Sequence, residues 1–272
     1  MNRSTFPPYL GTLRALAPVV FGSMALASLG VFAVRALVPP DALQADSDVV
    51  GNYLQTLGSI YAVLLAFVVV VVWGQFNDAR SHVEREANEL LDFCRTARGF
   101  PKEVCGRIHA FVREYVGAVT GPEWRAMAAD DTAGFERGWR LLDAVSDDFH
   151  RWEPASQVHI ALYGEMLARL NGLCDARTSR LSSSQIRIPR ALRILLYTGA
   201  AFTLGSMYLF SVSSLVIQLL VTASMAGALS HVLYVVEDLD DCFAGHWCVS
   251  PDPFLNVTDY LGRVDGAPKP AP

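Results

Sequence analysis

Residues 194–236 read ILLYTGAAFTLGSMYLFSVSSLVIQLLVTASMAGALSHVLYVV, forty-three positions without a single Lys, Arg, Asp or Glu. One helix of that length would extend about 65 Å, because an α-helix rises about 1.5 Å per residue. The hydrocarbon core of a bilayer is only about 30 Å thick. The stretch therefore predicts two membrane helices joined by a tight turn, which Ser211, Ser213 and Ser214 mark.

Two more charge-free runs lie nearer the N-terminus. Residues 15–34 form a run of twenty, and residues 49–77 form a run of twenty-nine that contains FVVVVVW at residues 67–73. We expect membrane helices at about 15–34 and 52–76, and hence an all-α integral membrane protein with four transmembrane helices. Only 18% of the residues are charged, against about a quarter in soluble domains. This deficit argues against a secreted domain, a basic nucleic-acid binder and an ordinary soluble enzyme.

The first apolar run is expected to remain in the mature protein. It is longer than the apolar region of a signal peptide, which has about 7–15 residues. Only Arg3 and Arg14 precede it, and no small-x-small cleavage site leads from it into a soluble domain. A retained membrane helix is the better interpretation.

The distribution of arginine predicts how the helices are oriented, since cytoplasmic flanks collect Lys and Arg. The connector 36–48 holds three aspartates and no basic residue, and Arg35 beside it is expected to snorkel outward. The other side of the predicted spans carries most of the arginines. We therefore expect a multi-pass protein of the cell (inner) membrane, in contact with lipids, with both termini in the cytoplasm.

The predicted spans divide the chain into residues 1–76, 77–193, 194–236 and 237–272. The segment 77–193 has seventeen basic and seventeen acidic residues, so its net charge is zero and it should not attract nucleic acid. Its apolar residues recur at helical spacing. We expect a cytoplasmic helical bundle between the second and third membrane helices, followed by a cytoplasmic tail.

An apolar stripe leads from the second membrane helix into this bundle. No Gly or Pro lies between Gly74 and Gly99, so the helix is expected to continue until Gly99-Phe100-Pro101. Further helices should end at Gly121-Pro122, near Pro154, and at the serines 182–184. The stripe consists of Phe76, Ala79, Val83, Ala87, Leu90, Cys94 and Ala97.

Polar residues follow one face of the outer half of the second membrane helix: Asn52, Gln55, Thr56 and Ser59. In lipid they must face protein or water, because an unsatisfied amide in hydrocarbon costs several kcal/mol. They can line a water-filled ion path or form hydrogen bonds between packed helices. In a pore, the inner half from Val68 to Val72 would form an apolar constriction that gates by dewetting.

Five arginines precede the third membrane helix, with no acidic residue between Asp175 and Glu237: Arg177, Arg180, Arg187, Arg190 and Arg193. Three interpretations compete. The arginines can bind lipid phosphates and hold the topology, pair with protein groups, or concentrate anions at a cytoplasmic pore mouth.

Four carboxylates follow the fourth membrane helix: Glu237, Asp238, Asp240 and Asp241. Negative charge opposes the dipole at a helix C-terminus, so a compensating charge is expected. In an antiparallel hairpin, Arg190 and Arg193 come within reach of Glu237 and Asp238, which favours ion pairing. A Ca²⁺ clasp is the second interpretation, because the ion prefers carboxylate and carbonyl oxygens.

The remaining candidate groups predict no firm metal site and no enzyme. All five cysteines lie on the predicted reducing side, so we expect free thiols, mostly buried. Cys242, His246 and Cys248 lack a fourth zinc ligand. His231 can sense pH, although a packed neutral histidine is the simpler interpretation. The sequence has no phosphate-binding loop and no hydrolase or metalloprotease motif, and we expect no cofactor beyond a possible Ca²⁺.

The order of these features resembles the bestrophin-like family of bacterial membrane proteins, over about residues 50–255. Where the family tail reads Pro-Phe-x-Gly, this chain has Cys242 in place of the proline, which bears on the local turn and on any ion clasp there. The resemblance is carried by Glu86-Ala87, Tyr115, Glu123-Trp124, Arg177-x-x-Arg180-Leu181, Ile188-Pro189, Asp240-Asp241-Cys242-Phe243-x-Gly245 and Phe254.

The resemblance implies a function as well as a fold. Bestrophins proper are pentameric anion channels with an apolar neck on the second membrane helix and an acidic Ca²⁺ clasp after the last. This chain is therefore expected to be a homo-oligomeric channel permeable to chloride or another small anion. A shared scaffold does not carry its function with it, so two alternatives stay open. One is a non-conducting scaffold or stress sensor acting through the helical segment, and the other is a membrane enzyme using Cys242, His246 or the aspartates.

Overall fold

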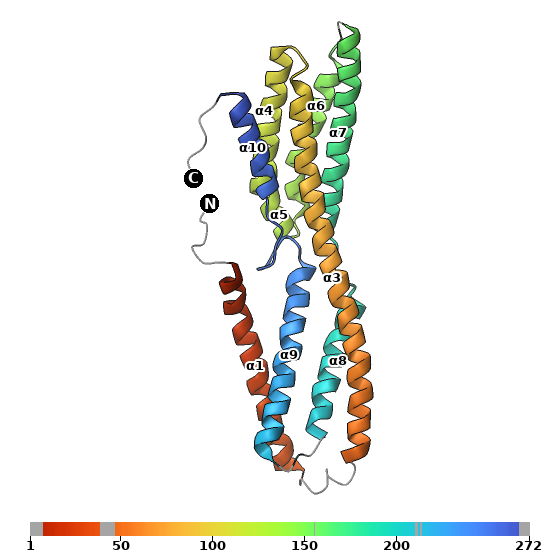
Figure 1. Cartoon of the computed structure of the whole chain (residues 1–272), viewed down its shortest axis with the longest axis vertical. Coiled ribbons are helices and arrows are strands. Elements are labelled where there is room, and N and C mark those ends of the chain that lie inside the picture. The colour runs from red at the N-terminus through yellow and green to blue at the C-terminus, as the bar shows by residue number, and fades with distance from the viewer. Residues whose placement is uncertain (1–7, 39–46, 155, 210–211, 213, 267–272) are drawn as a thin grey trace. The chain divides into compact units, whose positions relative to one another are not determined.

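The computed structural model describes residues 8–38, 47–154, 156–209, 212, 214 and 215–266, and it is helical wherever those residues form regular structure. The chain divides into two compact units. The first comprises Met1–Gly74 with Arg187–Asp240, and the second comprises Gln75–Ile186 with Asp241–Pro272. The helices of both units are labelled in Figure 1.

The described residues of the first unit form four helices: α1 (Pro8–Leu37), the first half of α3 (Ser47–Ala97), α8 (Arg190–Leu209) and α9 (Leu215–Asp240). Each is long and apolar enough to cross a membrane, among the described residues. This confirms the four predicted apolar helices. The predicted turn between the last two lies partly outside the described residues, but α8 ends and α9 begins on either side of it.

α1 packs along most of α9, and polar side chains link the two helices. Ser23 Oγ donates a hydrogen bond to Ser230 Oγ at 2.8 Å. Arg35, which was expected to snorkel outward, makes two hydrogen bonds within the unit. Its Nε donates to Oε1 of the buried Gln218 at 2.7 Å, and its NH2 donates to the carbonyl of Val212 at 2.5 Å. One acceptor between α8 and α9 and one in the first turn of α9 thus hold the guanidinium inside the unit.

The second unit is a bundle around the C-terminal part of α3, from Gln75 onward. Its core contains the predicted stripe, and Ala79, Val83, Leu90 and Cys94 are fully buried. The other elements are α4 (Lys102–Ala118), a π-helix (Val119–Glu123), α5 (Trp124–Ala128), a 3-10 turn (Thr132–Phe135), α6 (Glu136–His150), α7 (Gln157–Ser183) and α10 (Asp252–Val264).

One expectation for this unit was wrong. The helix does not end at Gly121-Pro122, because the chain widens there into a π-turn and continues as α5. A π-turn accommodates a proline that lacks an N–H donor. The expected tail also contains a helix, α10, which buries Phe254, Val257 and Leu261 on one face.

Contact between α3 and α8 depends on Gly199. The Tyr61 ring lies against the glycine, and its hydroxyl donates to the carbonyl of Leu196 at 2.9 Å. A Cβ at position 199 would lie 2.4 Å from a ring carbon. We predict that Gly199→Ala lowers the free energy of unfolding by about 1–3 kcal/mol through overpacking, measured by denaturation in detergent micelles.

Gly205→Ala is the matched control on the same helix, since a Cβ there meets no atom within 4 Å. This variant should leave stability unchanged or raise it slightly through helix propensity. Equal stability of the two variants would contradict the predicted contact.

Candidate functional site

The most unusual feature of the second unit is a buried group of four charged side chains and one tyrosine, here called the Arg–Glu cluster: Glu86, Tyr115, Glu123, Arg177 and Arg180. Both arginines are 0% exposed, and the two carboxylates are at most 1% exposed. Long charged side chains are almost never this buried unless they are paired. Each member comes from a motif that carries the family resemblance.

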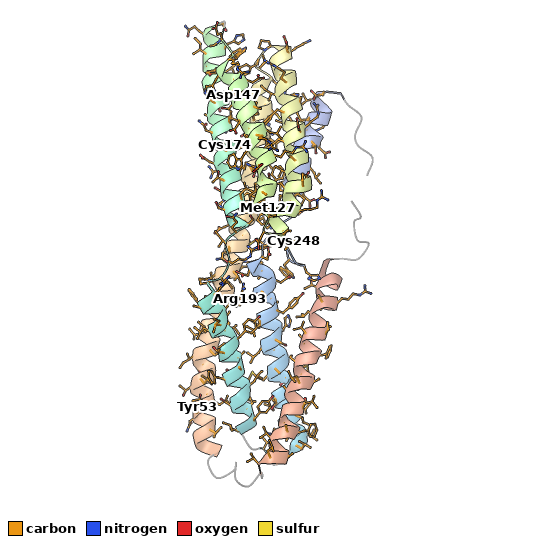
Figure 2. All side chains as sticks on the ribbon, turned by 180° about the vertical axis from the view of Figure 1, so that it is seen from behind. Tyr53, Met127, Asp147, Cys174, Arg193 and Cys248 are labelled. Carbon is orange, nitrogen blue, oxygen red and sulfur yellow. The ribbon has the colours of Figure 1, made fainter. Side chains whose placement is uncertain are left out.

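Arg180 joins the two carboxylates of the cluster. Its guanidinium contacts both oxygens of Glu86, with Nε donating at 2.5 Å and NH2 at 3.1 Å. NH2 also donates to Glu123 at 2.5 Å. NH1 approaches the sulfur of Met127, a residue labelled in Figure 2, at 2.9 Å. Arg180 therefore ties α3 to the π-turn after α4.

Arg177 makes the second bidentate contact, with NH1 and NH2 donating to Glu123 at 2.8 and 2.7 Å. NH2 also donates to the carbonyl of Phe135 at 2.8 Å. The guanidinium stacks over Trp139, 4.9 Å from its centroid. This close approach requires Gly138, because a Cβ there would lie 2.3 Å from the guanidinium.

The electrostatics of the cluster keep the arginines charged and the tyrosine neutral. Burial raises the pKa of Tyr115 well above its usual value, and the Glu86 carboxylate that accepts its hydrogen bond at 2.7 Å raises it further. Burial alone would lower the pKa of Arg180, but Glu86 and Glu123 outweigh burial and raise it. The cluster holds two positive and two negative charges that compensate each other.

This placement corrects one expectation. Arg180 was predicted at a cytoplasmic mouth or against lipid, but it is enclosed in protein and bound to two carboxylates. Of the three interpretations of the arginines, pairing with protein groups is therefore right for Arg177 and Arg180. Farther along the chain, Arg187 is half-buried and Arg190 is exposed.

The other motif residues of the second unit form an aromatic group. Trp124 stacks edge-on against Phe243, with ring centroids 5.4 Å apart, and against Phe254, at 6.2 Å. Gly245 has a φ of 81°, a left-handed conformation that favours glycine. The motif Phe243-x-Gly245 thus provides a buried ring and the turn after it.

In the first unit, Arg193 pairs with two carboxylates at the end of α9. It contacts Asp240 at 2.6 Å and Glu237 at 3.2 Å; Figure 2 labels this arginine. Asp240 is 2% exposed and also accepts the Ile188 N–H at 2.7 Å. Pro189 caps the start of α8 by accepting from the N–H of residues 192 and 193. The predicted ion pairing across the hairpin is confirmed for Arg193 and Glu237, with Asp240 as the second partner.

No three His, Cys, Asp or Glu side chains of the described residues are placed to hold a metal ion. Arg193 occupies Glu237 and Asp240, while half-buried Asp238 lies on α9. Asp241 belongs to the second unit, where Oδ1 accepts the N–H groups of residues 243 and 244. Calcium binding by these carboxylates stays a prediction.

The polar stripe of α3 is exposed in the single chain. Asn52, Gln55, Thr56 and Ser59 all face outward. The hydroxyls of Thr56 and Ser59 donate to carbonyls of their own helix at 2.9 and 2.8 Å. The stripe therefore does not pair with another helix of the described chain.

Val68 and Val72, predicted to line a constriction, are 0% exposed. They share a face with buried Tyr61 and cannot also line an open path. The face that carries Asn52, Thr56 and Ser59 continues, at spacings of three and four, through Val63, Phe67 and Val70. Those three side chains are 73%, 60% and 69% exposed.

The cysteine and histidine candidates lie apart from these sites. Cys242 is buried in the second unit, whereas Cys248 is exposed. His246 is exposed. His231 faces outward from α9, so the expectation of a packed histidine is wrong for the single chain.

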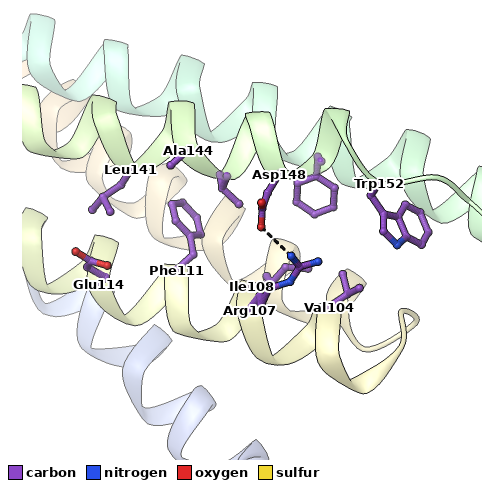
Figure 3. Close-up of a pocket in the computed structure, with 11 residues that line it drawn as sticks. Val104, Arg107, Ile108, Phe111, Glu114, Leu141, Ala144, Asp148 and Trp152 are labelled. Atoms are coloured by element: carbon purple, nitrogen blue, oxygen red, sulfur yellow. Dashed lines mark hydrogen bonds and ion pairs between the residues drawn. The ribbon is translucent and has the colours of Figure 1, made fainter.

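A pocket of about 290 Å³ opens between α4 and α6 of the second unit. Figure 3 shows Phe111 and Leu141 at its wall and Trp152 at one end. Arg107 and Asp148 pair across it at 3.2 Å. This pocket was not predicted from the sequence, because its lining combines buried apolar and exposed charged positions of α4 and α6 that form no motif.

The comparisons with known proteins agree with this arrangement. A family model for the Bestrophin-like domain matches residues 21–254. This chain belongs to the Bestrophin-like family. Among curated proteins, none matches the Bestrophin-like chain. Membership in this family makes it a membrane protein of a channel family. Its four apolar helices also indicate a membrane protein.

Solved structures share the fold of this Bestrophin-like protein. A bacterial bestrophin homologue from Klebsiella pneumoniae matches with a TM-score of 0.69 and 15% identity, covering 92% of this chain and 100% of its own. A single-residue variant of that homologue matches with a TM-score of 0.68 and 16% identity, covering 91% and 99%. At this identity the likeness shows the fold alone.

We predict that Glu123→Gln lowers the free energy of unfolding of the Bestrophin-like protein by about 3–5 kcal/mol. The variant leaves two buried guanidinium groups with one carboxylate between them. Denaturation in detergent micelles, followed by tryptophan fluorescence, measures the loss.

Glu136→Gln is the control, since that residue pairs with Arg140 on the surface and both are more than 70% exposed. Its effect should stay within about 0.5 kcal/mol. A similarly small effect of Glu123→Gln would show that the cluster does not hold the unit together.

Proposed function

We propose that this protein is a homo-oligomeric, anion-permeable membrane channel in which α3 faces the axis. The observation that carries the proposal is the outward-facing stripe of α3. The amides of Asn52 and Gln55 have no partner among the described residues. In a membrane, such groups need water or another protein chain, and a ring of identical helices around an aqueous path supplies both.

The same face supplies a constriction. On the C-terminal side of the polar residues, this face of α3 presents Val63, Phe67 and Val70, which are exposed in the single chain. Apolar rings of this kind gate ion passage by dewetting. The constriction proposed for this channel therefore consists of these three residues, in place of Val68 and Val72.

The preference for anions rests on the basic residues at the start of α8. Arg190 is exposed, Arg187 is half-buried, and both lie at the end of the hairpin expected to face the cytoplasm. Exposed arginines raise the local concentration of anions. Chloride or another small anion suits this arrangement, as the resemblance to bestrophin anion channels implies.

The topology belongs to the same proposal. We place the protein in the inner membrane, with the second unit and both termini in the cytoplasm, because Lys and Arg concentrate on that side of the apolar helices. Lipids then cover the exposed apolar side chains of α1, α8 and α9.

Chloride flux from liposomes tests the proposal through two neighbouring valines. Val70→Thr adds a hydroxyl to the proposed constriction without changing side-chain volume much, and it should raise flux several-fold by favouring wetting. Val68→Thr makes the same chemical change on the buried face, so it should leave flux per folded protein unchanged. Arg187→Glu combined with Arg190→Glu should reduce chloride flux.

Three results would contradict the channel. One is the absence of flux above empty vesicles from a preparation shown to be folded and oligomeric. Another is an equal effect of the two threonine variants. The third is unchanged chloride flux after reversal of both arginines.

The pocket between α4 and α6 favours a second function, a sensor that acts through the second unit. It is lined by apolar side chains with a few charged groups, as small-molecule sites are. Trp152 lies at the edge of the pocket, so binding of a small molecule there should change its fluorescence, and Trp152→Phe should abolish that change.

The sensor would be favoured if the folded protein shows no chloride flux but its Trp152 fluorescence changes when a cellular extract is added.

A further inference from the structure

Three titratable side chains meet between α4 and α10 in the second unit. Cys105 Sγ lies 3.6 Å from His109 Nε2, one helical turn along α4. His109 Nδ1 lies 3.0 Å from Asp265 Oδ1, at the C-terminal end of α10. Arg113 pairs with the other oxygen of Asp265. Figure 1 shows α10 beside α4.

The arrangement determines which nitrogen of the imidazole is free. A carboxylate only accepts hydrogen bonds, so the proton of neutral His109 lies on Nδ1, toward Asp265. Nε2 then presents its lone pair to the thiol of Cys105. The imidazole is 3% exposed, whereas Cys105 is half-buried.

The charges around Asp265 keep it ionised. Burial alone would raise the pKa of this carboxyl, but the hydrogen bond from His109 and the charge of Arg113 outweigh burial and lower it. Burial, together with the Asp265 carboxylate, raises the pKa of the Cys105 thiol. At neutral pH Cys105 therefore carries its proton and needs a base in order to react.

We propose that Cys105 is a site of reversible thiolation by low-molecular-weight disulfides, with His109 as its base and Asp265 as the positioning residue. His109 Nε2 takes the thiol proton, and Cys105 Sγ attacks one sulfur of the reagent. The sulfur–sulfur bond of the reagent breaks as the new one forms. The departing thiolate receives the proton from His109, so one thiol and one disulfide are consumed and one of each is produced.

Cys174 is a matched reference within the same unit. It is also half-buried, and burial also raises the pKa of its thiol. The charged groups that act on it are Asp175, Arg177 and Asp143, and no histidine is among them. A difference in reactivity between the two thiols therefore reports the imidazole.

The test uses purified full-length protein in detergent with excess glutathione disulfide. Thiolation is quantified at each cysteine by mass spectrometry of peptides after acid quenching. Cys105 should react at least about tenfold faster than Cys174, since a positioned base typically contributes more than this. Cys105→Ser should remove the fast phase and leave the Cys174 rate unchanged. Equal rates for Cys105 and Cys174 would overturn the proposal.

The variant His109→Asn tests whether His109 acts as a base toward Cys105 or only supports the structure. The asparagine amide can still donate to Asp265 from the position of Nδ1, but it offers no lone pair to Cys105. The Cys105 rate should fall to that of Cys174, while an unchanged Cys174 rate shows that the unit stays folded. An unaltered Cys105 rate would overturn the proposal. If His109→Asn does not fold, Asp265→Asn changes the more exposed carboxyl instead. It should slow the thiolation of Cys105 at least threefold, and an unchanged rate would likewise overturn the proposal.

Discussion

The second unit depends on pairing two guanidinium groups with two carboxylates away from water. A buried charge without a partner costs several kcal/mol, so the unit closes only when all four are matched. Glu86 comes from α3, Glu123 from the π-turn, and Arg177 and Arg180 from α7. Apolar helix surfaces tolerate small shifts against each other, whereas bidentate contacts do not. The cluster therefore specifies the register of three segments.

Much of the fold was predictable because hydrophobic periodicity determines helices and charge-free length determines membrane spans. The stripe from Ala79 to Ala97 proved to be buried, as its spacing predicted. The valine run was misinterpreted because five identical residues carry no periodicity of their own. Extending the phase of the polar stripe from Asn52 would have identified Val70 as the outward-facing position.

The site was less predictable because its members are far apart in sequence. Arg177 and Arg180 lie three residues apart on one face of a helix with apolar neighbours, which was a usable signal of burial. Their carboxylate partners stand 54 to 94 residues away and cannot be paired from spacing. Helix α10 was missed because it is short and follows a proline-rich turn, although Phe254, Val257 and Leu261 have helical spacing. Cys105 and His109 are one turn apart, but Asp265 reaches them only through α10.

The order of the cluster along the chain has a consequence for biosynthesis. The ribosome delivers Glu86 and Glu123 long before the two arginines of α7. Until then the carboxylates must stay hydrated, because closing the bundle around them would leave their charge uncompensated. In a chain that does not yet include residue 180, the bundle cannot close around these two carboxylates without that cost. The cluster can therefore form only after α7 has been synthesised, later than α3 and α4.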